Sequence, residues 1–246
     1  MIGHKTLAQL VANVKKMKLG SDAVVITNPS IARRYGRDLK RSLKRAGIKA
    51  QTFLVPEGEK SKSAKMAFKL IERLAQFATL KKPFIVALGG GVIGDLAGYV
   101  AAAYRRGIPY IQVPTTFLAQ IDSAIGGKVG IDLPCGKNLV GAFYQPKLVY
   151  SDVGVLTSLP VRQIRNGLAE AIKYGVLDDE TLFRFIEKHY QLILKADVKK
   201  LTELVVRCSR IKAKIVVADE KETRGIRSFL NFGHTLGHAI EAAGGY

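Results

Sequence analysis

The chain has 246 residues and 48% of them are hydrophobic, so it is long enough to bury the cores of two domains. Its 39 basic and 20 acidic side chains give a formal net charge of +19, which would suit nucleic acid, anionic lipid or small anionic substrates. No apolar run approaches transmembrane length and no signal-type stretch opens the chain, so we expect neither a membrane partner nor secretion. Cys135 and Cys208 suggest no disulfide framework and predict reduced thiols in a cytoplasmic protein.

Apolar periodicity predicts strands and helices in alternation over the first 150 or so residues. The expected strands are 23–27, 52–55, 84–88, 110–113 and 148–150. The expected helices are 7–17, 30–46, 64–78 and 95–104. Glycine and polar residues predict a loop over 122–138. This alternation indicates a parallel sheet wrapped by helices, the doubly wound, Rossmann-like α/β class.

The densest basic run lies in and just after the predicted helix 30–46. Its cations alternate with Ile31, Leu39 and Leu43, as on the solvated face of an amphipathic helix. No helix-turn-helix, zinc-finger or RNA-binding signature accompanies it, so we expect no nucleic-acid partner.

After about residue 155 the strand signals cease. Helical periodicity predicts helices over 160–177, 179–194, 198–219 and 231–243. We therefore expect an α/β domain over 1–154 and an all-α domain over 155–246.

The predicted strand 84–88 runs into Gly89, Gly91 and Gly94, spaced as G-x-G-x-x-G. Such glycines let the backbone approach a pyrophosphate at a helix N-terminus. The acidic residue expected about 20 positions later is missing. A purely structural turn therefore stays an alternative, and Asp95 is a candidate to hold the ribose of a dinucleotide.

His234 and His238 lie four residues apart, on one face of a predicted helix. Together with Glu170 they could hold a divalent metal, although ordinary polar helix residues would show the same spacing. Six further residues are candidate ligands for an anion: Arg106, Lys128, Lys137, Asn138, Lys212 and Arg227. On spacing alone, we would expect each of them to be an ordinary surface side chain.

Short motifs along nearly the whole chain occur in the same order as in one protein family. They cover 89–95, 105–107, 113–116, 122–128, 137–146 and 231–241, the last reading Asn-x-Gly-His-Thr-x-Gly-His-Ala-x-Glu. In these motifs the chain resembles 3-dehydroquinate synthase, a sugar-phosphate cyclase. The resemblance implies conversion of DAHP to 3-dehydroquinate and phosphate in the shikimate pathway, NAD and a divalent metal (zinc or cobalt) as cofactors, and a homodimer.

The resemblance also implies a role for individual residues. The NAD-binding set is Glu59, Lys62, Gly90, Gly91, Val92, Gly94, Asp95, Thr115, Thr116, Lys128, Lys137, Val155, Leu156, Thr157 and Ser158. The metal ligands are Glu170 and His234. The substrate-binding set is Asp122, Lys128, Asn138, Lys212, Arg227, Asn231, His238 and Arg106, which in relatives reaches in from the partner subunit. The catalytic set is Lys128, Lys173, Lys212 and His238, the last as proton carrier.

The chain departs from the family pattern at both ends. In relatives a third metal ligand, in a His-Gly-Glu segment, and a further basic phosphate ligand lie beyond the position of Tyr246. Ile2-Gly3 resembles the end of a strand. We therefore expect a chain truncated chiefly at its C-terminus, with an incomplete helical domain.

Other activities stay open. Sibling cyclases that make 2-deoxy-scyllo-inosose or act on sedoheptulose 7-phosphate use substrates without a carboxylate, which do not need the pair Lys212 and Arg227. A polyol dehydrogenase of the glycerol dehydrogenase type is a more distant alternative, and a basic nucleic-acid-binding or inactive fragment is a non-enzyme one.

Overall fold

The structure is a computed structural model that describes residues 1–6, 9–77 and 82–244. Within these residues the main sheet has the order β3-β2-β4-β5-β8, and each neighbouring pair is parallel. Its strands are β2 (Asp22–Thr27), β3 (Lys49–Leu54), β4 (Pro83–Gly89), β5 (Tyr110–Pro114) and β8 (Leu148–Val149). Along the chain this order reads 2-1-3-4-5, which is a doubly wound sheet. The predicted fold class is confirmed.

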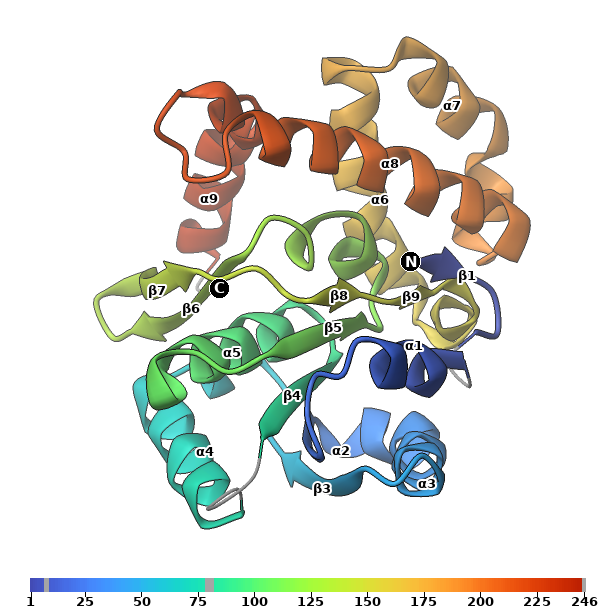
Figure 1. The fold of residues 1–246 in the computed structure, drawn as a ribbon. Coiled ribbons are helices and arrows are strands. Elements are labelled where there is room, and N and C mark those ends of the chain that lie inside the picture. The colour runs from blue at the N-terminus through green and yellow to red at the C-terminus, as the bar shows by residue number, and fades with distance from the viewer. Residues whose placement is uncertain (7–8, 78–81, 245–246) are drawn as a thin grey trace.

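Helices cover both faces of this sheet because its central strands bury both of theirs (Figure 1). Val24 and Ile26 belong to one core, with α4 (Ala64–Phe77) and α5 (Gly91–Ala103). Ala23 and Val25 belong to the opposite core, with α1 (Leu10–Lys16) and α3 (Arg37–Arg45). Successive strand residues point to opposite faces, so a continuous apolar run suits a strand buried on both sides.

The loop predicted over 122–138 is wrong. Strands β6 (Lys128–Leu133) and β7 (Gly136–Phe143) form an antiparallel hairpin, preceded by a π-helical turn over 119–123. Val129 and Ile131 are buried against α5 in the core of the sheet. The hairpin lies so close to α5 that a Cβ on Gly98 would come within 2.3 Å of Val129 Cγ1. The apolar alternation of β6 covers only Val129, Ile131 and Leu133, and β7 contains two glycines and no regular alternation, so the sequence favoured a loop.

Helices make up the rest of the described chain, in the upper part of Figure 1. After a 3-10 turn over 153–158 they are α6 (Val161–Leu177), α7 (Glu180–Leu194), α8 (Val198–Ala218) and α9 (His234–Ala243), with a 3-10 turn over 226–231 before α9. Asp179 and Asp197 cap α7 and α8 by accepting backbone hydrogen bonds of 3.0 Å. The proposed domain boundary at 154/155 falls inside the first of these turns and stays a proposal.

The start of the chain lies beside this junction. β1 (Ile2–Gly3) pairs in parallel with β9 (Ser151–Asp152), as expected of a strand at Ile2-Gly3. No helix in the described ranges is both long and apolar enough to span a membrane.

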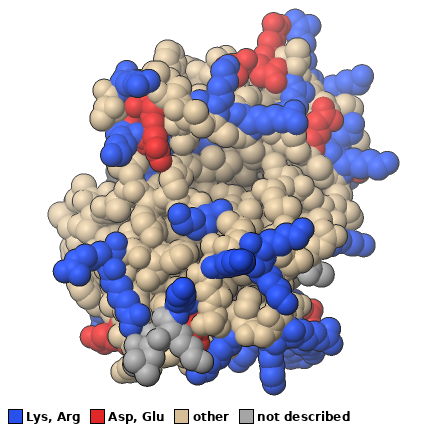
Figure 2. Space-filling view, viewed as in Figure 1, with Lys and Arg blue, Asp and Glu red and all other residues tan. Residues whose placement is uncertain are grey.

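The basic run forms an exposed surface. α3 buries Leu39 and Leu43 and exposes its arginines and lysines. Figure 2 shows Lys and Arg gathered over the lower part of this face, where Figure 1 draws α2 (Pro29–Ile31) and α3. The interpretation of this run as a solvated helix face is confirmed.

Candidate active site

A cavity of about 420 Å³, called here the glycine cavity, lies at the carboxyl ends of β2 and β4. It is lined by Asn28, Pro56, Glu57, Gly58, Glu59, Gly90, Gly91, Val92, Ile93, Thr116, Leu118, Gln163 and Asn166. After β2 the chain continues into α3 on one face of the sheet, and after the adjacent β4 it continues into α5 on the opposite face. Ligands of doubly wound proteins bind where the strand order reverses in this way.

The glycine turn presents a helix N-terminus to this cavity. α5 begins at Gly91, not at Asp95 as predicted, and its N-cap Gly90 has no side chain to bond the first amides. These amides and the helix dipole suit a phosphate. The backbone also packs closely, since a Cβ on Gly90 would lie 3.0 Å from Thr116 Cγ2. Gly94 has another role, because a Cβ there would lie 2.7 Å from Oε1 of the buried Gln112 on β5, so the glycine leaves room for this side chain between α5 and the sheet.

A second cavity of about 520 Å³, called here the basic cavity, is lined by the start of α5, the β6–β7 hairpin and residues of the helical part of the chain. It is lined by Asp95, Asp122, Ser123, Ile125, Lys128, Val129, Gly130, Asn138, Gly141, Ala142, Phe143, Lys212 and Arg227. Six residues of the predicted site thus meet although up to 132 positions separate them (227 minus 95). The cations Lys128, Lys212 and Arg227 make this cavity suitable for a small anion with more than one charged group.

Asp122 holds Lys212 in place on the wall of the basic cavity. Lys212 Nζ lies 2.5 Å from Asp122 Oδ1, and the Tyr174 hydroxyl donates to the same oxygen at 2.6 Å. Burial opposes ionisation of Asp122, but the Lys212 charge and these hydrogen bonds outweigh it and hold the pKa of Asp122 below its ordinary value. Asp122 is therefore ionised, and its carboxylate positions the Lys212 side chain before any ligand arrives.

This lowered pKa predicts a pH dependence of stability. A carboxyl group whose pKa falls on folding stabilises the folded state above its unfolded pKa of about 3.9, and this contribution disappears as pH falls through the folded-state pKa. The difference in unfolding free energy between wild type and Asp122→Asn should therefore be constant from pH 5 to 7 and shrink below about pH 4. Urea titrations at each pH measure it. A difference that grows on acidification would contradict the assignment.

Glu170 and Lys173 lie on α6 next to this pair and contact each other. Lys173 is buried and its Nζ donates to the carbonyl of Leu230 at 2.5 Å. Burial, reinforced by the negative charge of Asp122, raises the pKa of Glu170. The predicted metal ligand Glu170 is thus a partly buried carboxylate that already has a cation beside it.

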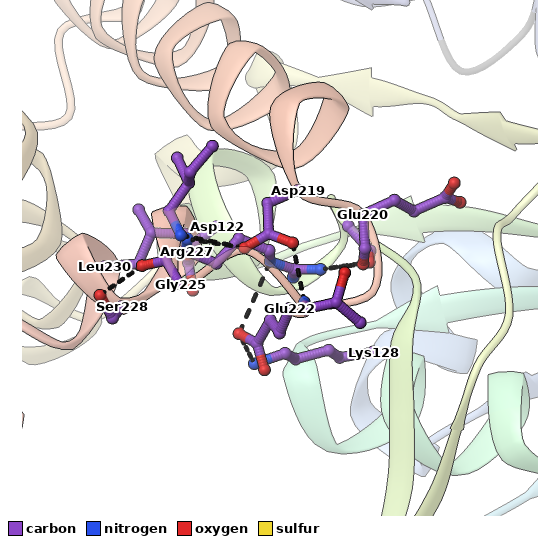
Figure 3. Close-up of polar contacts among 12 residues, drawn as sticks. Asp122, Lys128, Asp219, Glu220, Glu222, Gly225, Arg227, Ser228 and Leu230 are labelled. Atoms are coloured by element: carbon purple, nitrogen blue, oxygen red, sulfur yellow. Dashed lines mark hydrogen bonds and ion pairs between the residues drawn. The ribbon is translucent and has the colours of Figure 1, made fainter.

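The loop after α8 brings Arg227 to the basic cavity (Figure 3). Asp219 shapes this loop by accepting backbone hydrogen bonds from Thr223, Arg224, Ile226 and Arg227 at 2.9–3.4 Å. Arg227 is 2% exposed and donates from Nη1 to the carbonyl of Glu220 at 2.7 Å. Its Nε is buried and makes no hydrogen bond within the described residues.

Glu222 of the same loop lies between two cations of the basic cavity. Its carboxylate contacts Lys128 and lies 3.7 Å from Arg227 Nε (Figure 3). Glu222 was not predicted as a site residue. In the free protein this carboxylate neutralises part of the charge that an anionic ligand would meet.

We expect Glu222→Gln to tighten binding of inorganic phosphate by about two- to fivefold, the range of a partly exposed ion pair. Calorimetric titration with phosphate at low ionic strength measures the change. The matched control is Glu180→Gln, which removes the same charge from an exposed pair with Arg184 on α7. Unchanged or weaker phosphate binding by Glu222→Gln would contradict this role.

Lys62 lies between the two cavities, with its side chain 5% exposed. Its Nζ lies 2.8 Å from Asp95 Oδ2 and 3.8 Å from carboxylates of Glu59 and Asp132, and it contacts Asn138. Burial raises the pKa of Asp95 to about 6, and the Lys62 charge offsets only part of this rise. Burial would lower the pKa of Lys62, but the attraction of its acidic neighbours outweighs burial and raises it.

The remaining predicted cofactor residues lie in different places. Val155 and Thr157 line a third cavity of about 480 Å³, together with His4, Tyr35 and Asp152. Ser158 Oγ lies 3.2 Å from the Tyr35 hydroxyl, at the edge of that region, and Leu156 is buried in the helical core. Thr115 is buried and Thr116 lines the glycine cavity.

Other predicted residues are not among those that line the glycine or basic cavity. Arg106, Lys137 and Asn231 are exposed, and Arg106 has a left-handed backbone with φ of 61°. His234 begins α9 and is partly exposed. His238 lies in the same helix, but its side chain is outside the described residues.

The described side chains do not form a complete metal site. In the ranges given above, no three His, Cys, Asp or Glu side chains come together to hold an ion. A catalytic zinc has three protein ligands and an open position. The described side chains alone therefore supply fewer ligands than such a site needs.

Several residues in or beside the cavities escaped the sequence analysis. Asn28, Gln163 and Asn166 line the glycine cavity, whereas Tyr174 and Glu222 contact residues that line the basic cavity. Asn28 directly follows β2 at the carboxyl edge of the sheet, a position that could have identified it. The others come from helices and loops whose placement depends on tertiary packing, and no local pattern distinguishes them.

Family models match most of the chain. The model described as 3-dehydroquinate synthase N-terminal matches residues 52–166, and the C-terminal one matches 167–246. The chain is 48% identical over 246 residues to 3-dehydroquinate synthase of Pelobacter propionicus, covering 100% of itself and 68% of that protein. The chain belongs to the 3-dehydroquinate synthase family. The enzyme of Symbiobacterium thermophilum is also 48% identical, with the same coverage, so the chain spans about two thirds of these relatives.

Solved structures of sibling cyclases share the fold of this family member. 2-Deoxy-scyllo-inosose synthase, complexed with carbaglucose-6-phosphate, NAD⁺ and Co²⁺, has a TM-score of 0.89 at 28% identity, over 98% of this chain and 66% of that one. 2-Epi-5-epi-valiolone synthase of Streptomyces hygroscopicus, with NAD⁺ and Zn²⁺ bound, has a TM-score of 0.84 at 26% identity, over 95% and 65%. Glycerol dehydrogenase of Schizosaccharomyces pombe, at 20% identity and a TM-score of 0.66, shares the fold alone.

Proposed function

We propose that the chain carries out the 3-dehydroquinate synthase reaction, in which DAHP becomes 3-dehydroquinate and phosphate in the shikimate pathway. The observation that carries the proposal is the basic cavity, where buried Lys212 and Arg227 lie with Lys128 and Asn138. DAHP bears a phosphate and a carboxylate, and charge-assisted hydrogen bonds to such groups are the strong ones. Family membership and the identity to named synthases support this reading.

We assign the glycine cavity to NAD. It offers the uncapped N-terminus of α5 and lies where the strand order reverses, and a Cβ at Gly90 or Gly91 would lie about 3 Å from a neighbouring side chain (3.0 and 3.1 Å). Bound NAD would supply the transient oxidation and later re-reduction of one substrate hydroxyl. Thr116 and Val92 would complete the pocket, with Glu59 toward the adenosine end.

In the basic cavity the side chains would bind the two charged groups of the substrate. Lys128 and Asn138 would bind the phosphate and stabilise it as it leaves, while Lys212 and Arg227 would bind the carboxylate. Asp122 and Tyr174 keep Lys212 in place, so its orientation costs little when substrate binds. Elimination is followed by ring opening and an intramolecular aldol closure, which require that one flexible chain be held in order.

His238 would transfer the proton. Lys173 would assist through its ion pair with Glu170. We further propose a homodimer in which Arg106 of each subunit completes the site of the other, a cytoplasmic location, and no nucleic-acid partner. The exposed basic residues of α3 are spread along a solvated helix face, which supports the last point.

Metal content provides a direct prediction. Glu170 and His234 would be the ligands of a divalent metal, but the described residues bring no third ligand to them. We expect the chain, purified and dialysed against chelator-free buffer, to hold zinc substoichiometrically, with affinity orders of magnitude below that of a three-ligand site. Elemental analysis by mass spectrometry measures it. Stoichiometric zinc retained after dialysis would refute the expectation.

The function is tested by offering DAHP, glucose 6-phosphate and sedoheptulose 7-phosphate to the chain with NAD and added zinc or cobalt. We expect DAHP to bind most tightly and to be the substrate from which phosphate is released. Arg227→Met should abolish the preference for DAHP, whereas Arg224→Met, in the exposed part of the same loop, should keep it. Preference for a sugar phosphate without a carboxylate would support a sibling cyclase, and net accumulation of NADH would support a polyol dehydrogenase.

A further inference from the structure

An irregularity in the β6–β7 hairpin places Asp132 opposite Asn138. The register passes from Ile131 paired with Val140 to Leu133 paired with Gly136, so Asp132 faces the segment 137–139. Asp132 Oδ1 accepts the backbone N–H of Asn138 at 2.8 Å. Asn138 has a φ of 57°, a left-handed conformation that asparagine tolerates better than most residues. The Asp132 carboxylate therefore holds the backbone turn that presents Asn138 to the basic cavity.

Asp132 is also bonded to Lys62. Its backbone N–H donates to the carbonyl of Lys62 at 2.7 Å, and its carboxylate lies 3.8 Å from Lys62 Nζ. Lys62 Nζ in turn donates to the side-chain oxygen of Asn138. Asp132, Lys62 and Asn138 thus form a closed set of contacts, in which moving one residue disturbs both others.

This set lies between the two cavities. Glu59, 3.8 Å from Lys62 Nζ, lines the glycine cavity, whereas Asp95 and Asn138 line the basic cavity. Asp132 itself lines neither cavity. A ligand that engages the Glu59 side of this network would change the contacts of Lys62, and hence the position of Asn138.

We propose that Asp132 is a positioning residue that fixes Asn138 and Lys62 relative to each other and couples the dinucleotide cavity to the phosphate-binding cavity. The inference rests on the proposed function for the identity of the two ligands. Coupling is reciprocal, so NAD should tighten phosphate binding by the factor by which phosphate tightens NAD binding.

The first test follows the Asn138 amide by NMR hydrogen exchange, without any ligand. Asp132→Ala should speed its exchange by about fivefold or more, the loss of a typical net hydrogen bond. Asp132→Asn keeps an oxygen that can accept this bond and should leave exchange within about twofold of wild type. Asp38→Asn, on the exposed face of α3, removes the same charge and should change nothing. Equal exchange in wild type and Asp132→Ala would overturn the positioning role.

The second test measures phosphate affinity by calorimetry with and without saturating NAD. We expect wild type to bind phosphate at least about fivefold more tightly with NAD, at the lower end of typical coupling. Asp132→Ala should reduce this factor toward one, and Asp132→Asn should fall between, because it lacks the charge that attracts Lys62. A factor unchanged in both variants would overturn the coupling. Absence of NAD binding by wild type would overturn both the coupling and the proposed function, while the exchange experiment still decides the positioning role.

Discussion

Replacing Asp122 by alanine is expected to lower the unfolding free energy by about 3 kcal/mol, the lower end for breaking a buried ion pair. The Lys212 side chain is 8% exposed and its Nζ lies 2.5 Å from Asp122 Oδ1. Without Asp122 this ammonium would stay buried with no carboxylate against it, and the Tyr174 hydroxyl would lose its acceptor. Urea unfolding followed by circular dichroism measures the loss.

A double-mutant cycle separates the pair from the fold around it. Lys212→Met alone should also lower the unfolding free energy. The double variant, Asp122→Ala with Lys212→Met, should lose no more than half of the sum of the two single losses, because it leaves no unpaired charge of this pair buried. Asp38→Ala is the matched control, since its pair with Arg41 is exposed and should change stability by no more than about 0.5 kcal/mol. Strict additivity of the two buried substitutions would show that the ion pair contributes nothing.

Gly91→Asp is expected to weaken NAD binding by at least about 100-fold, because it sets a carboxylate where the dinucleotide phosphates would meet the N-terminus of α5. Repulsion between this carboxylate and the dinucleotide phosphates should weaken NAD binding more than the added volume of the side chain does. A Cβ at Gly91 would lie 3.1 Å from Ser123 Oγ, a contact that a small side-chain shift relieves. Calorimetric or fluorescence titration with NAD measures the change.

Gly91→Ala is the control for this substitution. It adds the Cβ without the charge, so we expect it to weaken NAD binding by less than about tenfold and to unfold at the wild-type temperature. If Gly91→Asp retains wild-type affinity while remaining folded, the glycine cavity is not where NAD binds.

The elements with strong local periodicity could be predicted from the sequence. The run 84–88 gave β4 because it is apolar throughout, and the amphipathic pattern of α4 repeats over four turns. The turn at Gly89–Gly91 is equally local, since its backbone geometry depends on residues next to one another. The sequence analysis missed the hairpin of β6 and β7, because β6 has only three alternating apolar residues (Val129, Ile131 and Leu133) and β7 contains two glycines and no regular alternation.

The sequence by itself determined the α/β-then-helical order, the glycine turn and the residue types suited to an anionic substrate, because these follow from neighbouring residues. Only the tertiary structure decided which of these residues meet. It paired Lys212 with Asp122 from 90 positions away, placed Lys62 between the cavities, and brought Glu222 against Lys128. Such contacts depend on how α8, the hairpin and the sheet pack together, and packing is a property of the whole core that no short pattern encodes.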